Sequence, residues 1–163
     1  MSVRRVIRIG LFALVGAFLL IQVIPYGRDH TNPPVTAEPA WDSQRTRALA
    51  QAACFDCHSN ETEWPWYTNV APLSWLTQRD VDEGRDALNF SEWDRPQKAE
   101  EVAEVIREGE MPPWSYTILH PGARLSDPEK ERLIAGLQAT FLASPPIEEG
   151  GGHGGEDEGS GEG

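Results

Sequence analysis

The pattern C-x-x-C-H occurs once in the chain, as Cys54-Phe-Asp-Cys57-His58. Residues three and four positions apart lie on one side of a helical turn, so the two thiols and the imidazole would point together. In that arrangement the thiols can bond the two vinyl groups of one porphyrin while the neighbouring histidine binds its iron. The pattern predicts one covalently attached haem c, with His58 as the proximal ligand of the iron.

Two other interpretations of the cysteine pair need to be weighed. A thioredoxin-like redox pair would accompany a βαβ pattern, which the sequence lacks. A structural zinc site needs four ligands, and Cys54 and Cys57 are the only cysteines in the chain. Their spacing is also too short for the disulfide framework of a small secreted domain. We therefore favour haem attachment.

The sixth coordination position of the iron has three candidate occupants. Met111 is the only methionine beyond the initiator, and it follows Gly109 and directly precedes Pro112 and Pro113. A thioether ligand raises the potential of an electron-transfer haem, and the two prolines would fix the backbone beside it. His120 is the competing ligand, and an open or water-filled position is the third alternative. Met111 is the one we favour.

Aromatic residues are dense around the motif and around Met111. We expect Trp66 and Trp114 to lie against the porphyrin, although plain core packing is the alternative for such side chains. The aromatic residues near the two segments are Trp64, Trp66, Tyr67, Trp75, Trp93, Trp114 and Tyr116.

Helical periodicity dominates residues 41–147, which we expect to form one all-α domain. Four helices are predicted: about 43–53, from Pro72 to about 88, from Asp94 to Gly109, and from Ser126 to about 143. Asp94 with Gln97, and Ser126 with Glu129, have the spacing of capping boxes. No alternating strand pattern is present.

The segments outside this domain differ from it in composition. Residues 1–25 carry Arg4, Arg5 and Arg8 before an apolar run that ends at Pro25, which predicts a signal-anchor or transmembrane segment. Cleavage as a signal peptide, near 35–37, is the alternative. Residues 26–40 are expected to be an extended linker, and residues 148–163 a disordered acidic, glycine-rich tail.

Charge and topology together limit the location and the partners. The arginines would keep the N-terminus in the cytoplasm, so the haem domain would lie in the periplasm or outside, held by a single pass at a bacterial inner membrane. The net charge is −12, which argues against nucleic acid and favours a basic redox protein as partner.

Five blocks of sequence resemble, in order, the bacterial haem-binding-domain family of small cytochrome-c-like proteins. The blocks are CFDCHSNETEWPWY at 54–67, APLSWL at 71–76, LNFSEW at 88–93, MPPWSY at 111–116 and HPGARLS at 120–126. The resemblance spans about 41–143. It implies covalent haem c and a class I cytochrome-c-like helical fold, in which the helix before the motif crosses the last helix closely. Ala48, Ala52, Ala53 and Gly136 are the small residues that would permit this crossing.

Three functions fit these expectations. One-electron transfer requires two protein ligands on the iron, and it is the function we favour over catalysis. A haem-based sensor or diatomic-ligand-binding module would need a labile or missing sixth ligand. A peroxidase-like enzyme would need an open iron with an acid–base residue, for which only His120 is available.

Overall fold

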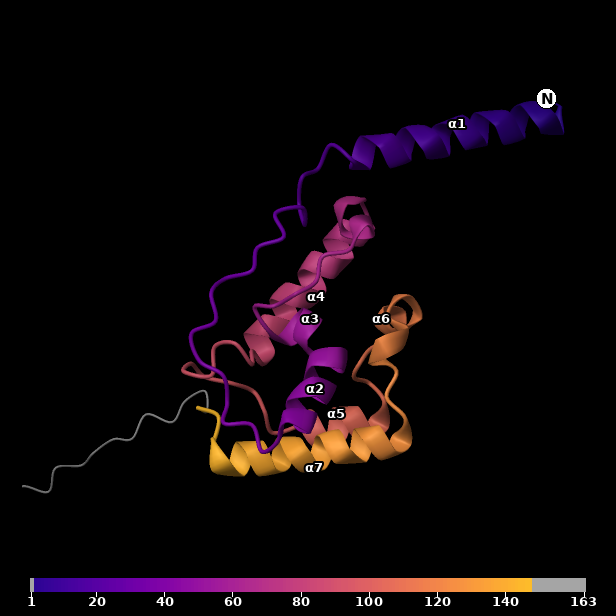
Figure 1. Ribbon diagram of the computed structural model, residues 1–163. Coiled ribbons are helices and arrows are strands. Elements are labelled where there is room, and N and C mark those ends of the chain that lie inside the picture. The colour runs from indigo at the N-terminus through magenta and orange to yellow at the C-terminus, as the bar shows by residue number, and fades with distance from the viewer. Residues whose placement is uncertain (1, 148–163) are drawn as a thin grey trace, which may run out of the picture.

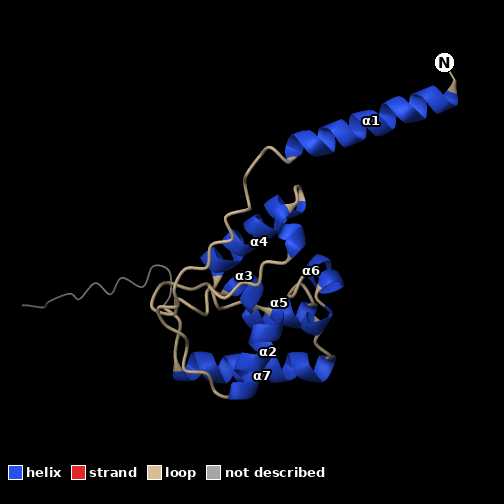
Figure 2. Cartoon of the chain, turned by 45° about the horizontal axis from the view of Figure 1, so that its top comes forward, coloured by secondary structure: helices blue, strands red, loops and turns tan. Residues whose placement is uncertain are grey.

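The computed structural model describes residues 2–147, and within that range the chain is helical without a β-strand (Figures 1 and 2). Only two isolated bridges occur there, Ala37 with Glu92 and Pro96 with Ile147. The predicted all-α class is confirmed. The α-helices are α1 Val3–Ile21, α2 Gln44–Ala53, α3 Phe55–His58, α4 Leu73–Ala87, α5 Val102–Glu108, α6 Trp114–Leu119 and α7 Asp127–Ala143, and the 3-10 helices are η1 Trp66–Asn69 and η2 Pro121–Ala123. The predicted tail, 148–163, lies outside the described residues.

Helix α1 projects away from the other helices (Figure 1), and none of its residues is buried. Its first turns contain Arg4, Arg5 and Arg8, so these charges are part of the helix and do not precede it. Within the described range, no helix has the length and the apolar character that crossing a membrane requires. The N-terminal transmembrane helix that we expected is therefore not supported.

The segment that follows α1 contains no helix and lies along the domain. Gln22 forms a pair of hydrogen bonds with the backbone of Ala71, one to the carbonyl oxygen at 2.9 Å and one from the N–H at 3.0 Å. Further along, the backbone N–H of Thr36 donates to Ser91 O at 2.9 Å. Gly27 has φ 77° and passes so close to Ser74 O that a Cβ would clash with it.

Helices α2 and α7 cross closely, as the small residues predicted. A Cβ on Gly136 would lie 2.7 Å from Cγ2 of Thr46, and Thr46, Ala50 and Ala53 are the buried residues of α2. The prediction was wrong about Ala48 and Ala52, which are exposed. The face of α2 that packs on α7 is therefore rotated about the helix axis from the face predicted. It includes Thr46, whose methyl group packs as a small side chain against Gly136.

Stacked aromatic rings connect the C-x-x-C-H motif to α7. Phe55, within the motif, stacks on Phe90 at 5.7 Å between ring centroids, Phe90 stacks on Trp93 at 6.0 Å, and Trp93 stacks on Phe141 at 5.4 Å. Phe55, Phe90 and Trp93 are buried. Core packing was one of the two roles that the sequence allowed for Trp93. The structure shows that it is a core residue, which packs against the motif through Phe90.

The two predicted capping boxes have different outcomes. Ser126 and Glu129 form theirs at the start of α7. The one at Asp94 is absent, because the helix starts at Val102 and not at the aspartate. Gln97 is buried, and its side chain accepts from the N–H of Asn89 at 2.8 Å and donates to Glu92 O at 2.7 Å. These tertiary hydrogen bonds hold 94–101 in an irregular conformation.

Candidate haem site

The C-x-x-C-H motif forms a single helical turn, α3, directly after α2. Cys54 separates the two helices with φ −125°, and its carbonyl oxygen accepts from the N–H groups of Cys57 at 3.1 Å and His58 at 2.9 Å. Both cysteines are free thiols of intermediate exposure. The turn therefore brings the three predicted residues together, as their spacing required.

His58 is held by the C-terminal end of α4. Its Nδ1 lies 2.9 Å from Gly84 O and 3.0 Å from Leu88 O. Since both partners are carbonyl oxygens, Nδ1 carries the proton and donates it, and the lone pair is on Nε2. A backbone carbonyl on one ring nitrogen is how proteins orient a histidine that binds metal through the other. Burial lowers the pKa of His58, which favours the neutral form that can ligate iron.

Gly84 permits the close contact between α3 and α4. A Cβ at this position would lie 2.5 Å from the carbonyl oxygen of Cys57, a distance that backbone atoms cannot accommodate without moving apart. The same residue supplies a carbonyl oxygen to His58. Sequence analysis missed Gly84 and Leu88, because a backbone acceptor leaves no sign in the residue type; the helix-interior glycine was the only available signal.

Burial disfavours the thiolate form of both cysteines. Burial raises the pKa of Cys54 to about 12 and that of Cys57 to about 12, with Asp80 and Asp56 adding to the effect at Cys57. A thioredoxin-like redox pair needs the opposite shift, since its attacking cysteine must be a thiolate. Among residues 2–147 no group of three or more histidine, cysteine or acidic side chains is arranged to hold a metal ion. Neither alternative interpretation of the cysteine pair gains support.

Met111 lies on the connection between α5 and α6. Gly109, at φ 78°, ends α5 in the left-handed conformation, and the N–H groups of Glu110 and Met111 both donate to Val105 O, at 2.9 and 3.1 Å. The side chain of Met111 is 39% exposed. An exposed thioether is not a core-filling methionine, which was the alternative to a ligand role.

His120 uses both of its ring nitrogens within the protein. Nδ1 lies 3.0 Å from Tyr116 O, and Nε2 lies 3.1 Å from the Tyr67 hydroxyl. The proton on Nδ1 goes to the carbonyl oxygen, so Nε2 accepts the proton of the tyrosine. His120 would have to give up this hydrogen bond to ligate iron, which favours Met111.

Trp66 and Trp114 are largely exposed, at 79% and 76%, so neither is part of the core. They belong to a set of large apolar side chains exposed on η1, α4 and the segment 111–119: Trp66, Leu73, Leu76, Met111, Trp114, Ile118 and Leu119. Exposed apolar side chains can mark a binding surface. Because a porphyrin is flat and mostly apolar, the expectation that Trp66 and Trp114 contact it is compatible with their exposure.

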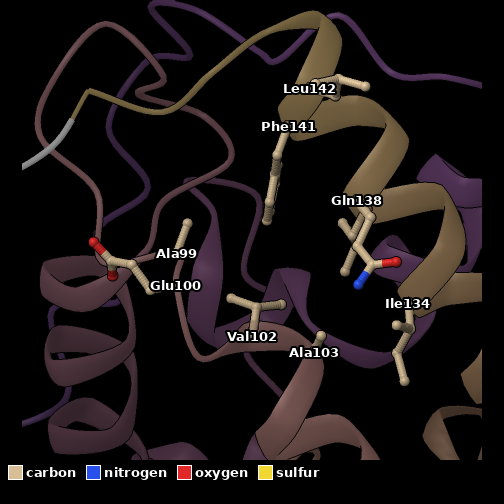
Figure 3. A pocket seen from close by; sticks show the side chains of 9 residues that line it. Ala99, Glu100, Val102, Ala103, Ile134, Gln138, Phe141 and Leu142 are labelled. Atoms are coloured by element: carbon tan, nitrogen blue, oxygen red, sulfur yellow. The ribbon is translucent and has the colours of Figure 1, made fainter.

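A hollow of about 290 Å³ between α5 and α7 is shown in Figure 3. It is lined mainly by apolar side chains and contains none of the predicted haem residues. The lining residues are Ala99, Glu100, Val102, Ala103, Ile134, Leu137, Gln138, Phe141 and Leu142.

An all-helical domain with a C-x-x-C-H turn and a histidine oriented by backbone carbonyls has the features of a haem-binding protein. The sequence matches the haem-binding domain family over residues 16–139, and the chain belongs to this family. A search of curated proteins found no match, and neither did a search of solved structures. The match begins at residue 16, well before the start at 41 inferred from the five blocks, and it includes the extended segment that lies along the domain.

Proposed function

We propose that the chain holds one haem covalently through Cys54 and Cys57 and serves as a one-electron carrier, not as an enzyme. The observation that carries the proposal is the double hydrogen bond of His58 Nδ1 to Gly84 O and Leu88 O. It leaves Nε2 as the donor atom, on the same turn as the two thiols. Bound haem would supply a reversible Fe(III)/Fe(II) couple.

Attachment would use the thiols as they are found here. When haem is bound, Cys54 and Cys57 would each hold it by a thioether: an S–H bond and a vinyl π bond would be replaced by one S–C and one C–H bond, with no net oxidation or reduction. The raised pKa of both thiols makes the thiolate scarce, and the cysteines are thereby protected from oxidation to a disulfide before attachment.

Met111 is the sixth ligand that we propose. It is exposed, it lies on a chain segment tied to the motif through Tyr116, and its competitor His120 is engaged by Tyr67. Two protein ligands leave no position for a substrate, which is why electron transfer is favoured. The class I cytochrome-c-like arrangement belongs to the same proposal, supported by the close α2–α7 crossing at Gly136.

A haem-based sensor or diatomic-ligand-binding module is the second candidate. The observation that favours it is the exposure of Met111 and the absence of any buried residue in the neighbouring helix α6. A ligand on a segment without a core could leave the iron and admit carbon monoxide or another diatomic molecule.

The partner that we propose is a redox protein with a basic surface. The chain has a net charge of −12, and α4, the helix that holds His58, exposes Asp80, Asp82, Glu83 and Asp86. Opposite charges would accelerate association, and salt would slow it. Electron-transfer rates that do not change with ionic strength would contradict this part of the proposal.

We place the chain at the outer side of a bacterial cytoplasmic membrane, associated through α1. The support is the arginine-rich start of α1 and the exposure of its large apolar side chains from Val3 to Leu20. Membrane fractions washed with high salt should retain the full-length chain and lose a variant that begins at residue 22. Recovery of the full-length chain in the supernatant would contradict the location.

The function is tested on protein matured in a host that attaches haem c. Haem should remain on the full chain in a denaturing gel and be lost from a Cys54→Ala, Cys57→Ala variant. The oxidised spectrum should be low-spin with the weak red band of a sulfur ligand, carbon monoxide should bind poorly, and Met111→Ala should reverse both properties. Haem that is not covalent would overturn the proposal, and ready binding of carbon monoxide by the parent chain would favour the sensor.

A further inference from the structure

Asp56, inside the C-x-x-C-H motif, connects the motif to helix α6. Its carboxylate accepts a hydrogen bond of 2.6 Å from the Tyr116 hydroxyl through Oδ2 and one of 3.0 Å from the N–H of Glu63 through Oδ1. The hydrogen bond between Asp56 and Tyr116 is charge-assisted, which makes it stronger than a neutral pair. It joins two segments sixty residues apart in the sequence.

His120 connects the other end of α6 to the segment that follows the motif. Its ring stacks on Tyr116 with 4.0 Å between centroids and 15° between planes. The same ring accepts from the Tyr67 hydroxyl at 3.1 Å, and its Nδ1–H donates to Tyr116 O at 3.0 Å. The histidine thus bridges η1, which carries Tyr67, to both the ring and the backbone of Tyr116.

These polar contacts take the place of a core in this part of the molecule. No residue of α6 is buried, whereas α2, α4 and α7 each bury three or more. Only Pro112 and Pro113 separate Met111 from α6. Because proline has a fixed φ angle, this connection has few conformations, and the position of α6 limits the position of Met111.

We propose that Asp56, Tyr67, Tyr116 and His120 form a latch that holds the segment 111–120 against the haem motif and so positions Met111 to ligate the iron. The inference rests on the proposed role of Met111. Its members are positioning residues, and His120 acts in the latch and not as a ligand. Opening the latch releases the methionine while the covalent bonds and His58 remain in place.

Tyr116→Phe tests the latch because it removes one hydroxyl and keeps the ring that stacks on His120. Ser115→Ala, at an exposed position of the same helix, is the matched control. In the haem-loaded full chain, Tyr116→Phe should accelerate amide hydrogen exchange over residues 114–120 by about tenfold or more, as expected for loss of one charge-assisted hydrogen bond. It should also weaken the red sulfur band and increase the rate of carbon monoxide binding, whereas Ser115→Ala should change none of these.

The outcomes separate the latch from the ligand. The latch is wrong if Tyr116→Phe has the amide hydrogen exchange, the red sulfur band and the rate of carbon monoxide binding of the parent. Failure of Tyr116→Phe to load haem would also overturn it, because a latch that only positions Met111 does not affect attachment. If Met111→Ala leaves the red band and carbon monoxide binding unchanged, Met111 is not the ligand; hydrogen exchange in Tyr116→Phe and Tyr67→Phe then still reports whether the latch exists.

Discussion

The motif turn that carries His58 and the segment that carries Met111 are held in different ways. His58 is fixed by backbone atoms: Nδ1 donates to Gly84 O in α4 and to Leu88 O just after it, and the carbonyl oxygen of His58 accepts from Phe90 N at 2.8 Å. The segment after Met111 is held by four partly buried polar side chains, the latch. Backbone contacts in a packed core resist local opening, whereas a helix that buries no residue, such as α6, opens at a lower free-energy cost. If His58 and Met111 ligate the iron as proposed, we expect His58 to stay bound and Met111 to be the more easily displaced ligand.

Gly84→Ala is the largest expected perturbation of the His58 side. The new Cβ would lie 2.5 Å from the backbone oxygen of Cys57, so α3 and α4 would have to separate, and the hydrogen bonds to His58 would be lost. We expect a cost of about 3 kcal/mol and a fall of about tenfold or more in haem-loaded yield. The yield is measured by haem stain per amount of chain.

Gly122→Ala is the control for this prediction, because nothing lies within 4 Å of a Cβ at that position. Its yield should equal that of the parent. If Gly84→Ala also gives the parent's haem-loaded yield, the contact between α3 and α4 does not hold His58 as rigidly as we expect.

Gly136→Leu tests the support behind the motif turn. Its side chain would collide with Thr46, separate α7 from α2, and so displace the helix that leads into Cys54. Overpacking of this kind costs about 1–3 kcal/mol, and haem-loaded yield should fall sharply. Ala135→Leu, at an exposed neighbouring position, should have little effect. Normal maturation of Gly136→Leu would show that the crossing does not position the motif.

Ser126→Ala and Asp94→Ala compare a helix cap that forms with one that does not. Ser126 caps the start of α7, so its loss should cost about 1 kcal/mol. Asp94 begins the irregular segment before α5, and its carboxylate accepts from the Thr36 hydroxyl at 2.7 Å. Its loss should stay within about 0.5 kcal/mol. Denaturant unfolding measures both, and equal costs would mean that Asp94 has a capping role after all.

Glu38 is expected to have the smallest effect, and the effect depends on pH. The side-chain hydrogen bond from Arg47 lowers the pKa of Glu38 below its ordinary 4.5, with an Nη2–Oε1 distance of 2.7 Å. Because the folded pKa is the lower one, the stabilisation is fully present above 4.5 and is lost as the pH falls through the folded value. The pair is partly exposed, so we expect about 0.5 kcal/mol at pH 7. Acid unfolding of Glu38→Gln should lack this component; identical pH profiles would contradict it.

The sequence predicts some elements well because their signals are local. Periodicity and capping place α2, α4 and α7 within one or two residues, and the Ser126 capping box forms as its spacing predicts. Asp94 and Gln97 have the same spacing, but the buried side chain of Gln97 is used by Asn89 and Glu92. A local pattern fails where a tertiary hydrogen bond competes for the same side chain.

The sequence alone determined that Cys54, Cys57 and His58 lie together, since their relation depends only on the geometry of one helical turn. Only the tertiary structure could decide which atoms orient His58. They are the backbone carbonyl oxygens of Gly84 and Leu88, and because every residue has such an oxygen, the residue type does not reveal which ones accept. It also decided that residues 22–41 lie along the domain and that Asp56 and His120 meet α6 and η1. Those contacts join segments tens of residues apart, and their free energy depends on how the whole chain packs.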